Sequence, residues 1–289
     1  MTASTGFDLS GVYCKKSEGV RKMRDDAKTT IDSAPAAENE ARTLSAGKRV
    51  LVAALVLLIV AGVAAVTLFM AVIIPRQNRR HAMQTCVPVM QSAQKGETVR
   101  FGAYEQDSNA MNGSEEIEWI VLQREEDRLL LISKYALDCS PFHTSGAMAT
   151  WDYSAINQWL NEAFYGEAFS AAEKCIVLST DVTPDANALF DTDPGKQTKS
   201  HVFLLSIPEA DELFDSQEAR RCTPTAFAET HGASAPSGGC VWWLRTPGYD
   251  GTAASRVLAD GSISYIGQPV DRSLAVRPAV WVSCADLEK

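Results

Sequence analysis

One uninterrupted apolar segment, residues 50–74, constrains this chain more than any other feature. It reads VLVAALVLLIVAGVAAVTLFMAVII and contains no charged residue. A helix of this length rises about 37 Å, enough to cross a hydrocarbon layer of about 30 Å with some tilt. A buried core helix rarely lacks a polar stripe over such a length, and a cleavable signal peptide has a shorter apolar run. The segment therefore predicts one transmembrane helix.

The cysteines indicate the orientation of this helix better than the basic residues around it. Lysines and arginines are equally frequent just before and just after the segment, and long domains translocate largely regardless of such charges. Cys14 precedes the segment and six cysteines follow it, an even number that suits disulfide pairing in an oxidising compartment. We therefore expect a single-pass protein of the cell membrane, with the N-terminus in the cytoplasm and the C-terminal domain outside.

The apolar segment divides the chain into four parts. Residues 1–48 are polar and lack a helical apolar period, which predicts a disordered cytoplasmic tail, with a docking segment for a cytoplasmic partner as the alternative. Residues 49–75 form the predicted transmembrane helix and 76–96 a juxtamembrane stalk. Residues 97–285 are expected to form the extracytoplasmic domain.

This predicted domain is strongly acidic. The whole chain has a net charge of −9, and residues 1–94 hold more basic than acidic side chains, so the remainder is more negative than the whole. Such a surface repels phosphate backbones and anionic headgroups. Nucleic acid is therefore excluded as a partner, and the membrane is expected to be contacted through the single span.

The domain mixes strand and helix patterns without a regular alternation of the two. Apolar runs on both sides of the charged turn REED predict a hairpin, and residues 175–182, 201–206 and 274–284 each predict a strand. The dipeptide Asp260-Gly261 predicts a second hairpin with a type I′ turn. We therefore expect an α+β fold of short helices and β-hairpins rather than a doubly wound sheet.

Several helix starts can be placed from capping residues. Thr150 is the predicted N-cap of a helix whose apolar residues recur at helical spacing through Trp151 and Trp159. The pairs Ser170 with Glu173 and Ser206 with Glu209 fit capping boxes. Thr223 is the predicted cap of a further helix that Gly232 would end.

The sequence carries no recognised catalytic or cofactor motif. It contains no phosphate-binding loop, no Gly-x-Ser-x-Gly elbow and no His-Glu-x-x-His pair. Asp191 and Asp193 resemble the start of a calcium loop, but no glutamate closes it, and the histidines lack ligand spacing. We therefore expect neither a metal nor a cofactor.

The segment CVWWLRTPGYDG, residues 240–251, concentrates unusual side chains. Strand alternation predicts that one of Trp242 and Trp243 points inward and the other to the opposite face. Arg245 and Arg277 are expected to stack on indole rings and donate to backbone carbonyls, a structural role that we prefer to substrate binding. The residues expected to be structural are Trp151, Trp159, Trp243, Arg245 and Arg277.

Cys222 and Cys240 are the candidate disulfide. The loop that they would close has about 18 residues, for which chain entropy gives about 3 kcal/mol of stabilisation. A nucleophilic role for one of these cysteines is the alternative.

Eight blocks of the sequence occur in the order found in a bacterial domain family. The region of residues 97–284 resembles the DUF6273 family, whose members have no assigned activity and often follow one membrane span in Gram-positive bacteria. Some members begin with a zinc ribbon, which Cys14 alone cannot build. The eight blocks are IEWIVL, LLLISKYALDC, TWDYSAINQWLNEAF, AFSAAEK, VFLLSIPEADELF, RRCTPTAFA, WWLRTPG and VRPAVWV.

The C-terminal half also resembles the C-type-lectin-like fold of formylglycine-generating-enzyme relatives. This resemblance implies a C-type-lectin-like mixed domain, although the copper-binding cysteine pair of those enzymes is not recognisable. A likeness of fold does not carry function with it.

We expect the domain to bind a carbohydrate or a protein without catalysis. Trp242, Tyr249, Asp250 and Tyr265 are the candidate contact residues, because amphipathic aromatic rings suit sugar faces and protein partners. One alternative is an enzyme acting on cell-wall or surface glycans, with Asp250 and Asp260 as an acidic pair. The other is a structural module that signals through the cytoplasmic tail.

Overall fold

The computed structural model describes residues 46–285. The predicted disordered tail, with Cys14, lies almost wholly outside these residues. A continuous helix contains the apolar segment and comprises α2 (Ala46–Leu68), a π-helical turn (Phe69–Ile73) and α3 (Ile74–Thr85). The stretch Gly47–Thr85 is long and apolar enough to cross a membrane, and the rest of the described chain covers none of its apolar window.

The segment predicted as a stalk contributes to the core of the domain. Ala82 near the end of α3, and Val87 and Met90 in α4 (Val87–Ser92), are fully buried in the same cluster as the sheet residues. The Arg124 side chain donates to the carbonyls of Met90, Gln91 and Ala93 at the C-terminal end of α4, where backbone acceptors have no partner within the helix. Residues 82–93 are therefore part of the domain.

A five-stranded antiparallel sheet forms one half of the domain. Its order is β1-β2-β3-β12-β7, so both ends of the domain sequence meet in one sheet. The predicted hairpin is confirmed, because β2 and β3 pair across the turn at residues 125–127. The strands are β1 (Thr98–Tyr104), β2 (Glu115–Arg124), β3 (Arg128–Ser133), β7 (Val202–Phe203) and β12 (Ala279–Ser283).

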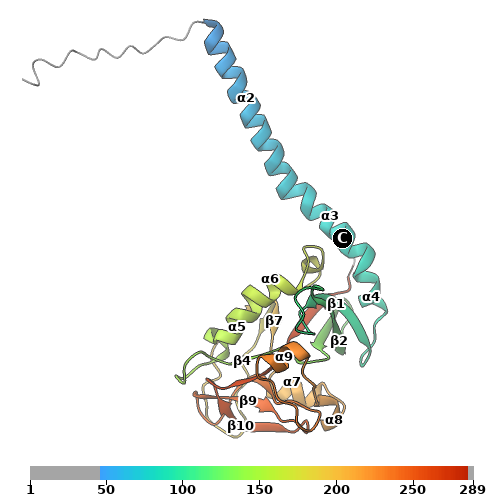
Figure 1. The fold of residues 1–289 in the computed structure, drawn as a ribbon, viewed down its shortest axis with the longest axis vertical. Helices are drawn as coiled ribbons and strands as arrows, with labels where there is room; N and C mark the ends of the chain where they lie inside the picture. Colours follow the sequence, from blue (N-terminus) through green and yellow to red (C-terminus); the bar gives the residue numbers. More distant parts are fainter. Residues whose placement is uncertain (1–45, 286–289) are drawn as a thin grey trace, which may run out of the picture. The chain divides into compact units, whose positions relative to one another are not determined.

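A second five-stranded sheet has the order β10-β9-β8-β11-β4. Figure 1 shows its β9–β10 hairpin at one end of the domain and α4 at the other. A separate two-stranded sheet pairs β5 with β6. The strands are β4 (Asp138–Pro141), β5 (Thr180–Val182), β6 (Thr198–Ser200), β8 (Trp242–Pro247), β9 (Ala253–Val257), β10 (Ile263–Pro269) and β11 (Ser273–Val276).

The strand predicted over residues 274–284 is two strands in different sheets. β11 pairs with β4 and β8 in the second sheet, whereas β12 pairs with β3 and β7 in the first. Arg277 and Pro278 join them, and Pro278 has no N–H to continue a ladder. The strands predicted over residues 175–182 and 201–206 are also shorter in the structure, as β5 and β7.

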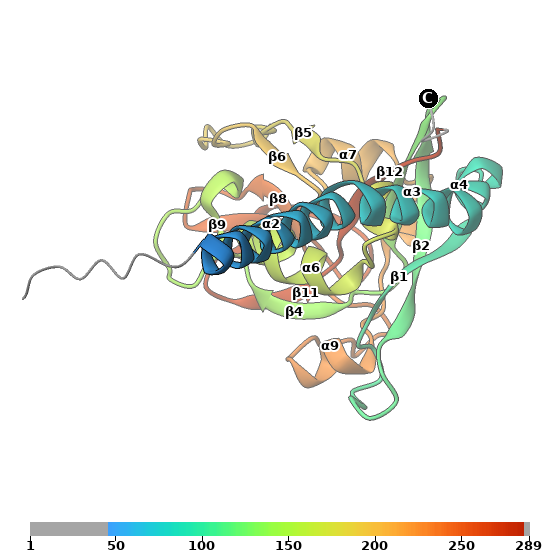
Figure 2. The same ribbon diagram turned by 90° about the horizontal axis from the view of Figure 1, so that it is seen from above.

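Short helices cover the sheets, and two predicted capping boxes are confirmed. Ser206 caps α7 reciprocally with Glu209, and Ser170 exchanges the same two bonds with Glu173. Figure 2 shows α9 beside the loop that joins β1 to β2. The helices are α5 (Ala155–Trp159), α6 (Tyr165–Ala168), α7 (Ile207–Glu212), α8 (Gln217–Arg220) and α9 (Ala226–Thr230), with π-helical Leu160–Phe164 and 3-10 turns Trp151–Tyr153 and Glu173–Cys175.

Two predicted caps and one turn type are wrong. Thr150 occupies the N-cap position of the 3-10 turn Trp151–Tyr153, but its hydroxyl donates to Asp152 and makes no cap bond. Ser154 caps α5, which begins one residue later. Thr225, not Thr223, caps α9. A type I′ turn at Asp260-Gly261 needs positive φ at both residues, but of the two only Gly261 has it. The α+β class itself is confirmed.

Candidate functional site

Three segments far apart in the sequence enclose a surface cavity of about 350 Å³. Residues 148–153 form one wall, residues 192–196 another, and Gly251 closes the cavity from the loop that follows β8. This loop is the TPGYDG part of the unusual sequence segment. The cavity is the candidate ligand site because loops carried by a folded core are where binding residues concentrate.

Hydrogen bonds to backbone carbonyls hold the Gly251 loop against the other two walls. The Ala149 N–H donates to Gly251 O at 2.7 Å, and the Thr192 hydroxyl donates to Gly248 O at 3.0 Å. The buried Asn187 amide donates to Pro247 O at 2.9 Å and to Tyr265 O at 2.8 Å. The loop is therefore fixed by residues from the long polar segment between β5 and β6.

Two aspartates and one lysine line the cavity. Asp152 Oδ1 accepts hydrogen bonds from the Thr150 hydroxyl and from the Lys196 N–H, and Asp193 Oδ1 accepts one from the Gly195 N–H at 2.9 Å. Both aspartates line the same cavity. Lys196 forms no ion pair within residues 46–285, so its ammonium group remains available to a ligand.

Gly195 permits this arrangement of the two aspartates. Its φ is +83°, a left-handed conformation that glycine adopts without strain. A Cβ atom at this position would lie 2.4 Å from Asp152 Oδ1 and 2.6 Å from Thr150 Cβ. Any other residue would therefore displace the cavity wall.

The structure places the four predicted contact residues differently. Tyr249 is 48 % exposed in the loop beside the cavity, and Asp250 turns the loop by accepting from the Thr252 N–H and hydroxyl. Tyr265 is half-buried, and its carbonyl accepts the Asn187 bond. Trp242 is 0 % exposed, so the expectation that it lies at the surface is wrong.

Both tryptophans of β8 are buried because neither face of this central strand meets solvent. Trp242 lies under the Arg277 guanidinium and donates to Arg220 O. Trp243 packs against Phe142 and donates to Ser140 O. Alternation sends the two rings to opposite faces, but sequence alternation cannot tell a solvated face from a covered one.

The predicted acidic pair does not come together. Asp250 precedes β9 and Asp260 follows it, so the five-residue strand, about 13 Å long at about 3.3 Å per residue, lies between them. The cavity instead brings together Asp152 and Asp193. Sequence reasoning did not select Asp152, Tyr153 or Lys196, because only the fold places their two segments side by side.

The two expected structural arginines are buried but differ in their partners. Arg245 bonds both carboxylate oxygens of Glu209, and it donates to Asp185 Oδ2 at 2.8 Å. Arg277 donates to Ser133 O at 2.9 Å and to Arg220 O at 3.1 Å, and its guanidinium lies over the Trp242 ring at 5.1 Å. Within residues 46–285, Arg277 forms no ion pair with a carboxylate.

Comparison with known proteins identifies the family. The model described as "Domain of unknown function (DUF6273)" matches residues 126–284. The chain belongs to the DUF6273 family. No curated protein and no solved structure matches the chain. The match begins in the turn between β2 and β3, later than the expected residue 97, although β1 and β2 complete the same sheet.

The two remaining expected structural tryptophans pack in the DUF6273 core. Trp151 is buried against Phe142, with ring centroids 6.4 Å apart, and it donates to the Thr198 hydroxyl. Trp159 is partly buried and packs against Phe164 at 5.6 Å.

The six cysteines of the described residues are free thiols, so the candidate disulfide between Cys222 and Cys240 is not present. The two buried side chains are nevertheless neighbours, because each acts on the ionisation of the other, and the Cys240 N–H donates to Cys222 O at 2.7 Å. The Cys222 thiol itself donates to Lys134 O at 3.7 Å and to Thr223 O at 3.5 Å. Burial opposes ionisation of Cys222, but the Cys240 thiol and the Arg277 guanidinium together lower the pKa of Cys222 to about 7. The hydrogen bond to Cys222, with burial, raises the pKa of Cys240.

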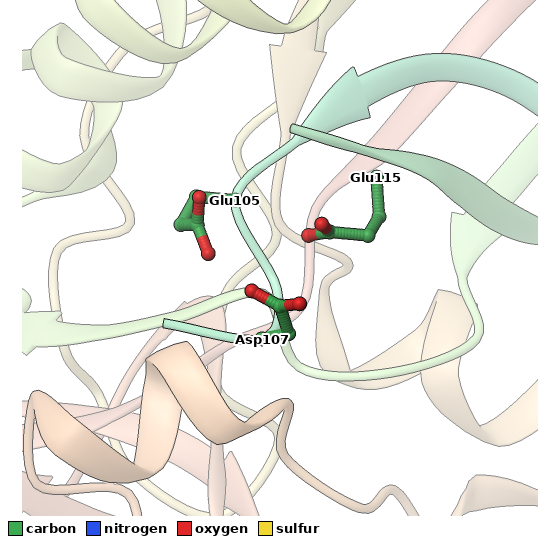
Figure 3. A group of neighbouring side chains, drawn as sticks. All are labelled: Glu105, Asp107 and Glu115. Atoms are coloured by element: carbon green, nitrogen blue, oxygen red, sulfur yellow. The ribbon is translucent and has the colours of Figure 1, made fainter. Parts of the chain in front are cut away.

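Three carboxylates gather in the loop between β1 and β2 of the DUF6273-containing chain. Figure 3 shows the side chains of Glu105, Asp107 and Glu115 facing one another. One oxygen of each lies within 4.8 Å of the others. These carboxylates already accept hydrogen bonds from the same loop. The Asn109 N–H donates to Glu105 and to Asp107, the Asn112 amide donates to Asp107, and the Gln106 N–H donates to Glu115. The cluster is explained by its own loop, and the absence of a metal site stays a prediction.

Proposed function

We propose that this chain is a single-pass membrane protein whose DUF6273 domain binds a carbohydrate outside the cell without turning it over. The observation that carries this proposal is the cavity, whose lining residues include two aspartates, one lysine, two threonines and one tyrosine. Sugars offer hydroxyl groups that both donate and accept, and apolar ring faces that pack on aromatic side chains. A C-type-lectin-like arrangement of the domain is part of the same proposal.

The polar groups of the cavity fit such a ligand in detail. Asp152 Oδ1 accepts from the Thr150 hydroxyl and from the backbone N–H of Lys196. No group within residues 46–285 donates to Asp152 Oδ2. The Tyr153 hydroxyl donates to Met148 O at 2.5 Å, which fixes the ring at the edge of the cavity. A ligand hydroxyl can thus donate to Asp152 and accept from Lys196 while a sugar face lies near Tyr153.

Binding should be tested with the full chain in lipid nanodiscs on an array of glycans. Lys196→Met should weaken the binding of a retained glycan about tenfold or more, since a hydrogen bond to a charged group contributes about 1.5–3 kcal/mol. Lys199→Met is the matched control, because this exposed lysine of β6 removes the same charge away from the cavity. Failure of every glycan to bind, or equal losses in both variants, would contradict the proposal.

A glycan-cleaving enzyme is the second candidate, and one observation favours it. Asp152 and Asp193 accept from consecutive N–H groups, so two carboxylates lie in one cavity, as glycoside hydrolysis requires. If the wild-type chain releases shorter glycans and Asp152→Asn does not, the enzyme proposal replaces the binding proposal. Binding without any release supports the first proposal.

The proposed orientation has its own test. Met111 is 97 % exposed in the loop between β1 and β2. In intact cells a membrane-impermeant maleimide should label M111C more strongly than the parent chain, and it should label Cys14 only after permeabilisation. The opposite pattern would place the domain in the cytoplasm.

A further inference from the structure

A second cavity, of about 450 Å³, lies on the domain away from the proposed glycan site. Basic groups dominate its lining, although the domain as a whole is acidic. Cys222, which is 3 % exposed, is among the residues that line this cavity. The titratable and charged groups that line it are Lys134, Tyr135, Glu218, Arg221, Cys222 and Arg277.

The backbone around Cys222 is held on both sides. Arg220 O accepts from the Trp242 indole and from Arg277. Cys222 O accepts from the Cys240 N–H, and Thr223 O accepts from the Ala136 N–H at 3.0 Å. These bonds hold the backbone of residues 220–223 beside Trp242, Cys240 and Arg277.

Arg277 supplies a positive charge that the other side chains leave uncompensated. Its side chain is 1 % exposed, and its bonds within residues 46–285 go to neutral carbonyls. Of the other cations lining the cavity, Lys134 pairs with Glu118 at 2.8 Å and Arg221 donates to Ser237 O at 3.0 Å. A buried cation without a counter-charge is costly. Both Arg277 and Cys222 line this cavity, and the guanidinium favours the ionised form of Cys222 by lowering the pKa of its thiol.

We propose that Cys222 and Cys240 form a redox-active dithiol, with Cys222 as the attacking thiolate and Cys240 as the resolving thiol. The oxidant is a hydroperoxide small enough for the cavity. Cys222 Sγ attacks the terminal peroxide oxygen and the O–O bond breaks. Cys222 becomes a sulfenic acid, and the other oxygen takes a proton and leaves as an alcohol or as water.

The second step closes the disulfide. Cys240 Sγ gives up its proton and attacks Cys222 Sγ, and the S–O bond of the sulfenic acid breaks. The departing hydroxyl takes that proton and leaves as water. Two thiols are oxidised by two electrons in total, and the hydroperoxide is reduced by two. A thiol reductant reverses the change by exchange.

Cys139 shows what distinguishes this pair from an inert thiol. It is buried near Asp138, and burial together with that carboxylate raises its pKa to about 11. Among residues 46–285, no cation is found that lowers the pKa of this thiol. Cys139 is therefore an internal control in the same chain.

Reactivity should be measured on the reduced full chain in nanodiscs, with brief iodoacetamide treatment from pH 5 to pH 9 and peptide mass mapping. Cys222 should be alkylated with a midpoint near pH 7 and at least about tenfold faster than Cys139 at that pH. Equal rates at the two cysteines would overturn the proposal.

Oxidation gives the decisive measurement. Hydrogen peroxide should produce a peptide linked through Cys222 and Cys240 that a glutathione buffer titrates reversibly. Cys240→Ser should accumulate sulfenic acid at Cys222, trapped by dimedone, whereas Cys222→Ser should accumulate none at Cys240; circular dichroism checks that both variants fold. The absence of a linkage, sulfenic acid at Cys240 in Cys222→Ser, or a disulfide that the buffer cannot reduce would each overturn the proposal.

Discussion

Arg245 and Arg277 occupy equivalent-looking sequence contexts, each beside tryptophan and proline, but their surroundings differ in charge. Arg245 leaves β8 toward α7 and is bonded by Glu209 and Asp185. Arg277, between β11 and β12, donates to carbonyls and lies over aromatic rings, and it forms no ion pair within residues 46–285. A guanidinium paired with carboxylates joins two elements of the fold. An unpaired guanidinium also shifts the pKa values of nearby groups, here the thiols of Cys222 and Cys240.

The largest effect is expected at the paired arginine. Arg245→Met should lower the free energy of unfolding by about 3–5 kcal/mol, because it leaves Glu209 and Asp185 without their cation. Urea unfolding of the full chain in detergent, followed by tryptophan fluorescence, measures this loss. A loss below about 1 kcal/mol would show that solvent satisfies these carboxylates and would remove the contrast between the two arginines.

A smaller loss is expected at the unpaired arginine. Arg277→Met removes two hydrogen bonds to carbonyls and the contact with Trp242, so about 2 kcal/mol should be lost in the same measurement. The alkylation midpoint of Cys222 should also rise by at least about one pH unit. Arg277→Lys, which keeps the positive charge, should give a lower midpoint than Arg277→Met; equal midpoints would show that charge is not the cause.

The smallest effect is a dependence of stability on pH. The pKa of Cys222 is lowered from 9.0 to about 7 in the folded chain, so its ionisation stabilises the fold above pH 9 and this contribution is lost as the pH falls through 7. The reduced chain should therefore gain about 1–2 kcal/mol between pH 7 and pH 9. The raised pKa of Cys240 acts oppositely, since its contribution is lost as the pH rises above 9.

Unfolding of the reduced chain at several pH values checks this dependence. Cys222→Ser should remove the gain between pH 7 and pH 9, whereas Cys139→Ser should keep it. A stability that falls steadily over this range in the wild-type chain would contradict the proposed thiolate.

Sequence patterns correctly predicted features that depend on residues close together in the chain. The turn at residues 125–127 and the Ser206 capping box depend on charges and hydroxyls a few positions apart. The burial of Trp242 could not be predicted, because it depends on β8 being the middle strand of a covered sheet. The candidate cavity depends on three loops meeting, and Asp152 and Lys196 lie 44 positions apart in the sequence.

The environment of Cys222 and Cys240 also depends on contacts between distant segments. Sequence spacing made Cys222 and Cys240 candidates for a bond, and the structure places them together. That Arg277 would act on both could not be predicted, because Arg277 arrives from the crossover between two sheets. Chemistry that depends on long-range packing becomes visible only in the folded chain.

The strand order of the first sheet determines where the domain can be cut for expression. A fragment starting at residue 126, where the family match begins, would lack β1, β2 and α4 and would leave β3 as a long, apolar edge strand. Such edges pair with other chains and aggregate. A fragment starting near residue 76 would retain Met90, Trp119 and the Arg124 bonds to α4, and should yield soluble protein where the shorter one precipitates.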